Sequence, residues 1–177
     1  MLRTIRVVPY DPSWQAAFAA ERELLAPLFA DLDPVIHHIG STAVPGLAAK
    51  PIIDVLIEVR EIAAVDRLDS AMRAAGYTPM GEYGIPGRRF FLHGPGPDEE
   101  RTAHVHVFAK GSPDAERHLA FRDYLIARPD EAKAYGALKR ELARRHPHDI
   151  EAYMAGKEAL IRELQRRALL RKRGARE

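Results

Sequence analysis

Two histidines and an aspartate are the residues of this sequence whose types and spacing most directly suggest chemistry. His104 and His106 lie two residues apart in an apolar, β-prone segment. In a strand both imidazoles face the same side, about 6.6 Å apart along it, and could converge on one metal ion or one phosphate. Asp54 interrupts the apolar run 52–59, where a buried carboxylate needs a partner. These three side chains predict a binding or catalytic site, and the alternative is ordinary packing within a sheet.

A glycine–serine pair stands fourteen residues before Asp54, between two strand-like segments. Gly40 tolerates backbone conformations that other residues resist, and Ser41 and Thr42 can cap a helix that follows. A helix that begins here would direct free N–H groups and its positive dipole end at the turn, which suits a phosphate. We therefore interpret Gly40, Ser41 and Thr42 as a phosphate-binding turn. The alternative is a tight connection between a strand and a helix.

Three cations are candidate phosphate clamps. Lys50 stands just before the apolar run 52–59, and Arg88 and Arg89 stand at the entry of a strand, beside a loop rich in Gly and Pro. Arginine is suited to bidentate contact with phosphate, which favours a role for at least one of the two. The alternative for the arginines is a solvated pair at a strand end.

Other titratable residues are interpreted from their place in the expected elements. His37 and His38 point to opposite faces of their strand, and His38 is expected to face the Gly-Ser turn. Arg122 and Lys139 lie on amphipathic helical segments and are expected on solvated faces. Lys157, in the last helical segment, is a lesser candidate for phosphate contact.

The hydrophobic pattern predicts an α/β (α+β) fold in which a mixed sheet is followed by a helical C-terminal part. Pro113, Pro129 and Pro147 separate three helical segments near the end of the chain. The expected helices are 14–30, 61–75, 114–127, 130–145 and 149–170, and the expected strands are 4–9, 35–39, 52–59, 77–80, 89–92 and 102–108, with a polar connection over 94–100. We expect one domain over residues 1–165, helical from about residue 113, and a basic tail over 166–177 that frays.

Composition and charge exclude several classes of protein. The chain has 177 residues, of which 46% are hydrophobic and 29% charged, with no cysteine and a formal net charge of +2. Disulfides and thiolate metal sites are therefore excluded. No run approaches the ~20 apolar residues of a membrane span, and the first residues lack the apolar stretch of a signal peptide, so a cytoplasmic location fits. Aromatic residues are not interleaved with the basic tail, so binding of nucleic acid is not expected.

Several longer strings of residues resemble the GrpB family. The resemblance follows the expected order over roughly residues 5–165. The family is placed in the nucleotidyltransferase superfold, in which helices flank a mixed sheet, and similar domains occur fused to some bacterial dephospho-CoA kinases. The strings that carry the resemblance are Val8-Pro9-Tyr10-Asp11-Pro12-Ser13-Trp14, His38-Ile39-Gly40-Ser41-Thr42-Ala43-Val44-Pro45-Gly46-Leu47, Lys50-Pro51-Ile52-Ile53-Asp54, Gly87-Arg88-Arg89-Phe90-Phe91, His104-Val105-His106-Val107, Phe121-Arg122-Asp123-Tyr124-Leu125 and Tyr153-Met154-Ala155-Gly156-Lys157.

This resemblance implies a nucleotide site. In the superfold the Gly-Ser turn binds the nucleotide phosphates, and carboxylates in an acidic-apolar-acidic pattern on the next strand hold divalent metal. Asp54 would be the catalytic carboxylate, but Ile52 or Leu56 stands where the second carboxylate is usual. Histidines could replace the missing ligand and would favour Mn²⁺ or Zn²⁺ over Mg²⁺. The metal ligands expected on this basis are Asp54, His38, His104 and His106.

Three functions remain open from the sequence. The first is binding of a nucleotide or another phosphorylated small molecule, with metal-dependent nucleotidyl transfer as its catalytic form. The second is a non-catalytic ligand-binding module linked to coenzyme A metabolism, which the missing carboxylate favours. The third is a metal-dependent hydrolase that uses the histidines and Asp54.

Overall fold

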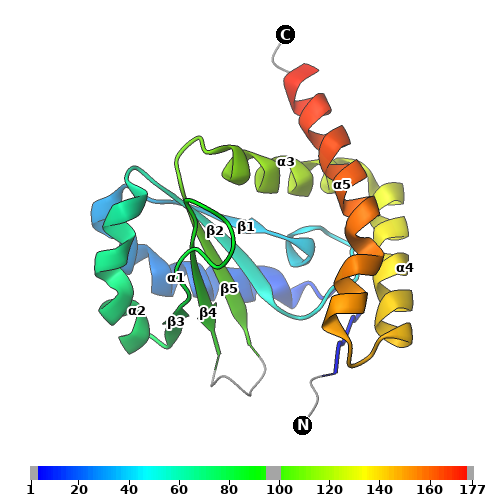
Figure 1. Cartoon of the computed structure of the whole chain (residues 1–177), viewed down its shortest axis with the longest axis horizontal. Helices are drawn as coiled ribbons and strands as arrows, with labels where there is room; N and C mark the ends of the chain where they lie inside the picture. Colours follow the sequence, from blue (N-terminus) through cyan, green and yellow to red (C-terminus); the bar gives the residue numbers. More distant parts are fainter. Residues whose placement is uncertain (1–3, 95–100, 175–177) are drawn as a thin grey trace.

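The computed structural model describes residues 4–94 and 101–174. A five-stranded sheet lies at the centre of this part of the chain, with the strand order β1-β2-β5-β4-β3 (Figure 1). Strands β2 and β5 run parallel, and the other neighbouring strands are antiparallel, so the sheet is mixed. The strands are β1 (Val35–Ile39), β2 (Ile53–Val59), β3 (Tyr77–Pro79), β4 (Arg89–His93) and β5 (Ala103–Ala109).

Helices cover both faces of the sheet. One face packs against the first helix and a later helical pair, and the other face packs against α3. The last two helices, α4 and α5, lie together to one side of the sheet (Figure 1). The α-helices are α1 (Ser13–Phe29), α2 (Asp69–Ala74), α3 (Pro113–Ala127), α4 (Pro129–Arg145) and α5 (Ile150–Gly174), and the short 3₁₀ helices are η1 (Ala30–Leu32), η2 (Ser41–Ala43) and η3 (Ile62–Leu68).

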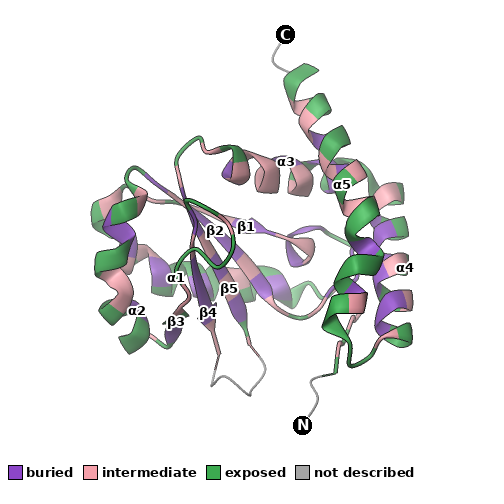
Figure 2. Ribbon diagram, in the orientation of Figure 1, coloured by how far each residue is buried: buried purple, intermediate pink, exposed green. Residues whose placement is uncertain are grey.

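The alternation of side chains along β2 makes the two faces different. Val55 and Ile57 point into the larger hydrophobic core, which α1 and α2 complete. Asp54 and Leu56 point to the opposite face, where Leu56 packs with Phe108 and with residues of α3. Figure 2 shows buried residues concentrated on the strands and on the helix sides that face them. Asp54 is therefore held at the boundary of a packed core rather than on an open surface.

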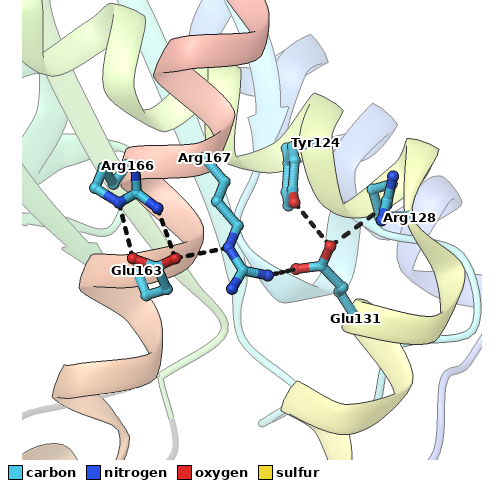
Figure 3. A network of polar contacts seen from close by, with 6 residues as sticks. All are labelled: Tyr124, Arg128, Glu131, Glu163, Arg166 and Arg167. Atoms are coloured by element: carbon cyan, nitrogen blue, oxygen red, sulfur yellow. Dashed lines mark hydrogen bonds and ion pairs between the residues drawn. The ribbon is translucent and has the colours of Figure 1, made fainter.

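A network of polar contacts ties the three C-terminal helices together (Figure 3). Glu131 of α4 accepts a hydrogen bond from the Tyr124 hydroxyl of α3 at 2.7 Å and pairs with Arg167 of α5 at 3.1 Å. Arg167 also pairs with Glu163 one helical turn earlier, at 2.7 Å. Since each helix contributes a side chain, the network fixes α4 and α5 relative to α3.

The predicted architecture is confirmed. The sheet is mixed, helices flank it, and the chain is helical from Pro113 onward. The nucleotidyltransferase-like arrangement expected around the turn is present, since Gly40 and Ser41 follow β1 and Asp54 lies on β2, the next strand.

Two expected elements differ from the structure, and a third lies mostly outside the described residues. Residues 61–75 form the 3₁₀ helix η3 followed by the short α2, not one α-helix. Residues 4–9 do not form a strand of the sheet. Within the described part of the chain, Val8 alone of this segment pairs, in an isolated bridge with Ala49, and Pro9 has no N–H with which to extend it. The expected connection over 94–100 lies, apart from its first residue, outside the described residues.

The expectation that the chain frays after residue 165 is wrong for residues 166–174. Helix α5 continues to Gly174. Ala168 is buried against α3 and α4, and Arg166 and Arg167 both pair with Glu163. Apolar contact and ion pairing along one turn therefore extend the helix where the run of basic residues suggested a loose end.

The lack of a long apolar run in the sequence argues against a membrane span. Within residues 4–94 and 101–174, none of the helices combines the length and the apolar character needed to cross a bilayer.

Candidate functional site

Asp54 lies between the two histidines that the sequence singled out. Its Oδ1 atom is 3.4 Å from Nδ1 of His104 and 3.6 Å from Nε2 of His106. The parallel pairing of β2 with β5 sets this geometry. Asp54 is directly opposite His104, and His106 is the next residue of β5 whose side chain points to the same face. Burial by itself would raise the pKa of Asp54, but the adjoining imidazoles outweigh burial and hold this pKa well below its ordinary value. Asp54 is thus a carboxylate anion.

Arg88 contacts the ring nitrogen of His106 that faces away from Asp54. Its Nη1 lies 3.4 Å from Nδ1 of His106, and its Nη2 donates to the carbonyl of Tyr83 at 2.6 Å. A guanidinium can only donate, so Nδ1 of His106 accepts and the ring proton is on Nε2, which faces Asp54. Burial lowers the pKa of His106, which favours this neutral ring. Arg88 therefore orients His106 and does not itself reach the cavity described below.

The Gly-Ser turn lies directly against Asp54. Gly40 has a φ of +72°, and a Cβ atom at this position would be 2.5 Å from Oδ2 of Asp54. Glycine is thus required twice, once by the left-handed backbone and once by the carboxylate. After Gly40 the chain enters η2, and the hydroxyl of Ser41 faces the helices that follow. The turn and the aspartate, fourteen residues apart, are one structural unit.

A cavity of about 370 Å³ opens between this unit and the C-terminal helices. Its volume lies in the range of small-molecule sites. Among its described lining residues, Asp54 is the only acidic one, and three lysines and an arginine are also present. The residues that supply the polar lining are Ser41, Thr42, Lys50, Asp54, His104, His106, Arg117, His118, Tyr135, Lys139, Tyr153, Lys157 and Gln165.

Two of these lysines are buried. Nζ of Lys139 donates a hydrogen bond to Oγ of Ser41 at 2.7 Å, and the side chain is only 3% exposed. Nζ of Lys157 lies 4.7 Å from the ring centre of Tyr153, and Nζ of Lys50 lies 5.6 Å from the same ring centre. Among the residues that the structure describes, neither Lys139 nor Lys157 forms an ion pair with a carboxylate.

Burial and mutual repulsion act on both lysines. Burial lowers the pKa of Lys139 to about 7, and the charges of Lys157 and Lys50 add to this effect. Burial likewise lowers the pKa of Lys157 to about 8, with Lys50 as the second cause. A group of ammonium ions held together out of water, with one aspartate nearby, favours an anionic ligand that would neutralise them.

His118 is a further lining residue that the sequence did not single out. Its Nε2 atom is buried and has no hydrogen-bond partner within the described residues. Burial lowers the pKa of His118 to about 3, and the nearby His106 and Arg117 lower it further, so its ring is neutral. The ring centres of His118 and His106 are 5.3 Å apart. His118 therefore places a buried nitrogen without a hydrogen-bond partner among the described residues at the wall of the cavity.

Other predicted site residues lie away from this cavity or face it differently. His38 is opposite Val55 in the sheet, so its ring points to the face opposite Asp54, where it stacks on Phe18 at 4.7 Å. Its Nε2 forms a hydrogen bond with the hydroxyl of Thr42 at 2.9 Å, so this hydroxyl already has a partner within the protein. Arg89 forms a hydrogen bond with Asp66 at 2.9 Å and is not a lining residue.

The residues present do not fit the divalent-metal centre that the resemblance implies. No group of three His, Asp or Glu side chains within residues 4–94 and 101–174 is arranged to hold a metal ion. Ile52 and Leu56, the two positions at which a second carboxylate could stand, are both apolar, and Leu56 pairs with His106 on the Asp54 face. His38 is on the wrong face, so the four expected ligands do not meet at one point. Asp54 instead has two imidazoles in direct contact.

Lys139 and Lys157 were underestimated from the sequence. Lys139 lies on the buried stripe of α4, between Tyr135 and Leu142, and Lys157 lies one turn after the buried Tyr153. A lysine at an apolar position of a helical pattern is the signal that could have identified them.

Comparison with known proteins gives a consistent assignment. The family described as GrpB protein matches residues 4–167. The UPF0157 protein YqkA of Bacillus subtilis is 48% identical over 172 residues, which cover 97% of this chain and 49% of that protein. A dephospho-CoA kinase of Mycolicibacterium paratuberculosis is 34% identical over 186 aligned residues, which cover 93% of this chain and 46% of the kinase. The chain thus spans about half the length of each of these two relatives.

One solved structure matches over nearly its whole length. The crystal structure of the conserved protein GrpB from Enterococcus faecalis is 42% identical in sequence and superposes with a TM-score of 0.89. The match covers 94% of this chain and 99% of that one. The fold described above is therefore shared with that protein.

The contact between Gly40 and Asp54 leads to a stability test. We expect Gly40→Ala to destabilise the protein by about 2–4 kcal/mol, since it adds a steric clash with the carboxylate to a strained backbone. Gly46→Ala is the matched control, because Gly46 has a φ of +79° and nothing within 4 Å of its added Cβ. Denaturant unfolding measures both variants. Equal losses of stability would show that the turn does not press on Asp54.

Proposed function

This chain belongs to the GrpB family, and from that premise we propose that its cavity binds a phosphorylated small molecule, such as a nucleotide, through lysine side chains and without a divalent metal ion. The observation that carries the proposal is the contact of Lys139 with Ser41, at 2.7 Å, beside Lys157. This contact places a buried cation at the glycine–serine turn, the position at which the resemblance to the nucleotidyltransferase superfold implies that phosphates bind.

Charge is the main argument for this ligand class. The described lining residues include Lys50, Lys139, Lys157 and Arg117, of which Arg117 pairs with Asp114 at 3.0 Å, and Asp54 is the one acidic residue among them. A phosphate group brings up to two negative charges and several acceptor oxygens. It would restore the full charge of the buried lysines and accept hydrogen bonds from them, which a neutral ligand cannot do.

The proposal is limited to binding. Nucleotidyl transfer of the usual kind uses two metal-binding carboxylates, and Ile52 or Leu56 stands where the second is needed. A hydrolase that uses His38 with Asp54, His104 and His106 would need these residues on one face, and His38 is on the other. In the proposed complex, Lys139 and Lys157 hold the phosphate, Ser41 positions Lys139, and Asp54 keeps the histidines oriented.

A ligand from coenzyme A metabolism is the second candidate. It is supported by the relative named dephospho-CoA kinase, in which the matched region covers 93% of this chain. Dephospho-CoA contains a diphosphate, so it satisfies the same charge argument as a nucleotide. This candidate corresponds to the non-catalytic module considered from the sequence.

The lysine proposal predicts the effect of removing each charge. We expect the protein to bind ADP in the presence of EDTA, and Lys139→Met and Lys157→Met each to weaken binding about ten-fold or more, the value of a charge-assisted hydrogen bond. Lys133→Met is the matched control, because Lys133 is exposed on the same helix as Lys139. Isothermal titration calorimetry measures the affinities. Binding that appears only after Mg²⁺ is added would contradict the proposal.

The pH dependence of ADP binding has a definite sign. In the free protein the pKa of Lys139 is about 7 and that of Lys157 about 8, and a bound anion raises both. Below about 7 both lysines are already charged and affinity is greatest. At higher pH each lysine must take up a proton on binding, so we expect affinity to fall by up to about ten-fold per lysine and pH unit.

Calorimetry in buffers of different ionisation enthalpy measures this proton uptake directly. ADP suits the test because its terminal phosphate, with a pKa near about 6, is largely ionised throughout the range. In the Lys157→Met variant the uptake at the alkaline end should fall by about one proton. A constant affinity with no proton uptake would contradict the buried-lysine account.

The coenzyme A candidate is tested by comparison of two diphosphates. If the whole ligand is recognised, dephospho-CoA should bind about ten-fold or more tightly than ADP, because the rest of the molecule adds contacts. Competition of each compound against a fluorescent ADP analogue provides the measurement. Equal affinities would remove this candidate and leave the proposal for phosphorylated ligands in general intact.

A further inference from the structure

A second cavity adjoins the first and has the same volume, about 370 Å³. The two cavities share part of their lining, namely Lys50, Ile52 and His104. The three shared residues place the two cavities next to each other. The remaining lining residues of the second cavity are Thr4, Ile5, Arg6, Pro51, Arg101, His148 and Ile150.

The wall of the second cavity is built from segments far apart in the sequence. The N–H of Ile5 donates to the carbonyl of Pro147 at 2.7 Å, which ties the N-terminal segment to the connection between α4 and α5. Ile5 also packs against a cluster that contains Tyr153, whose ring carries Lys50 and Lys157. The two cavities are thus joined through one packed wall, and their relative position is set by the fold.

The lining of the second cavity combines apolar and cationic side chains. Ile5, Ile52 and Ile150 supply apolar surface, and Ile150 is 49% exposed although it is a large hydrophobic residue. Arg6 and Arg101 supply positive charge, and no carboxylate pairs with either within the described part of the chain. No acidic residue is among the described lining residues of this cavity.

We propose that the second cavity binds the organic part of the same ligand and a second anionic group attached to that part. The ligand is then an organic molecule with two anionic groups, the first held by Lys139 and Lys157, the second by Arg6 and Arg101. An apolar body bridges them across Ile52. This inference rests on the proposed function, because it assumes that the first anionic group occupies the lysine-lined cavity.

The composition of the site supports this division. Binding sites for organic ligands are mostly apolar with a few charged groups that fix orientation, and the second cavity has this composition. A separate inorganic ion would gain nothing from the isoleucines. A purely apolar ligand would leave the two arginines without an anionic partner among the described residues.

Three probes separate the parts of the site. Pyrophosphate presents one anionic group, ADP adds an organic body, and 3′-phospho-ADP adds a second anionic group to that body. We expect the wild-type protein to bind 3′-phospho-ADP about ten-fold or more tightly than ADP, from one added charge-assisted contact. Isothermal titration calorimetry in EDTA measures all three.

Two variants assign the gain to the second cavity. Arg6→Ala combined with Arg101→Ala should abolish the advantage of 3′-phospho-ADP and leave pyrophosphate binding unchanged within about two-fold. The control removes the same charge elsewhere, with Arg22→Ala and Arg171→Ala, both exposed. Ile150→Asp should weaken binding of both nucleotides but not of pyrophosphate. An aspartate at this first position of α5 is compatible with the helix.

The outcomes distinguish the two proposals. Equal affinity of the wild-type protein for ADP and 3′-phospho-ADP, with pyrophosphate still bound, would overturn the second-cavity inference alone. An equal loss for all three probes in the arginine double variant would also overturn it, because the arginines would then act only through the general field. Failure of the wild-type protein to bind pyrophosphate or ADP at all would overturn the proposed function.

Discussion

Burial of Lys139 and Lys157 without a carboxylate partner among the described residues is the constraint on which this account depends. A buried ammonium is costly unless something compensates its charge, and here the nearest lysines make the cost larger. The protein tolerates this arrangement in the free state by lowering the pKa values of both groups. A ligand that carries negative charge removes the cost, which is why the site selects an anion.

The rest of the fold keeps this arrangement in place. The pairing of β2 with β5 sets Asp54 against His104 and His106, and Arg88 orients His106 from the far side. The turn at Gly40 lies directly against Asp54, and the hydroxyl of Ser41 accepts a hydrogen bond from Lys139. The contacts in Figure 3 hold α4 and α5, which carry the two lysines, against α3. The apolar cluster shared by α3, α4 and α5, together with these polar contacts, therefore holds both lysines at the cavity.

The sequence predicted those parts of the site that depend on local pattern. The turn and Asp54 flank short elements with clear strand and turn signals, so their proximity could be inferred, and Gly40, Ser41 and Asp54 do line one cavity. The side of the sheet that His38 faces depends on the register of β1 with β2, which no local pattern reveals. The role of Lys139 depends on how α4 docks on the turn, almost a hundred residues away in sequence.

The most direct test is an NMR titration of the lysine side-chain amines, assigned by comparison with the Lys139→Met and Lys157→Met variants. For the free protein we expect a pKa of about 7 for Lys139 and about 8 for Lys157, and in saturating ADP we expect both values to rise above about 9, because the bound anion favours the charged amines. Ordinary lysine values of about 10.4 in the free protein, or values that ADP leaves unchanged, would contradict the central claim that buried lysines without a carboxylate partner among the described residues create this site.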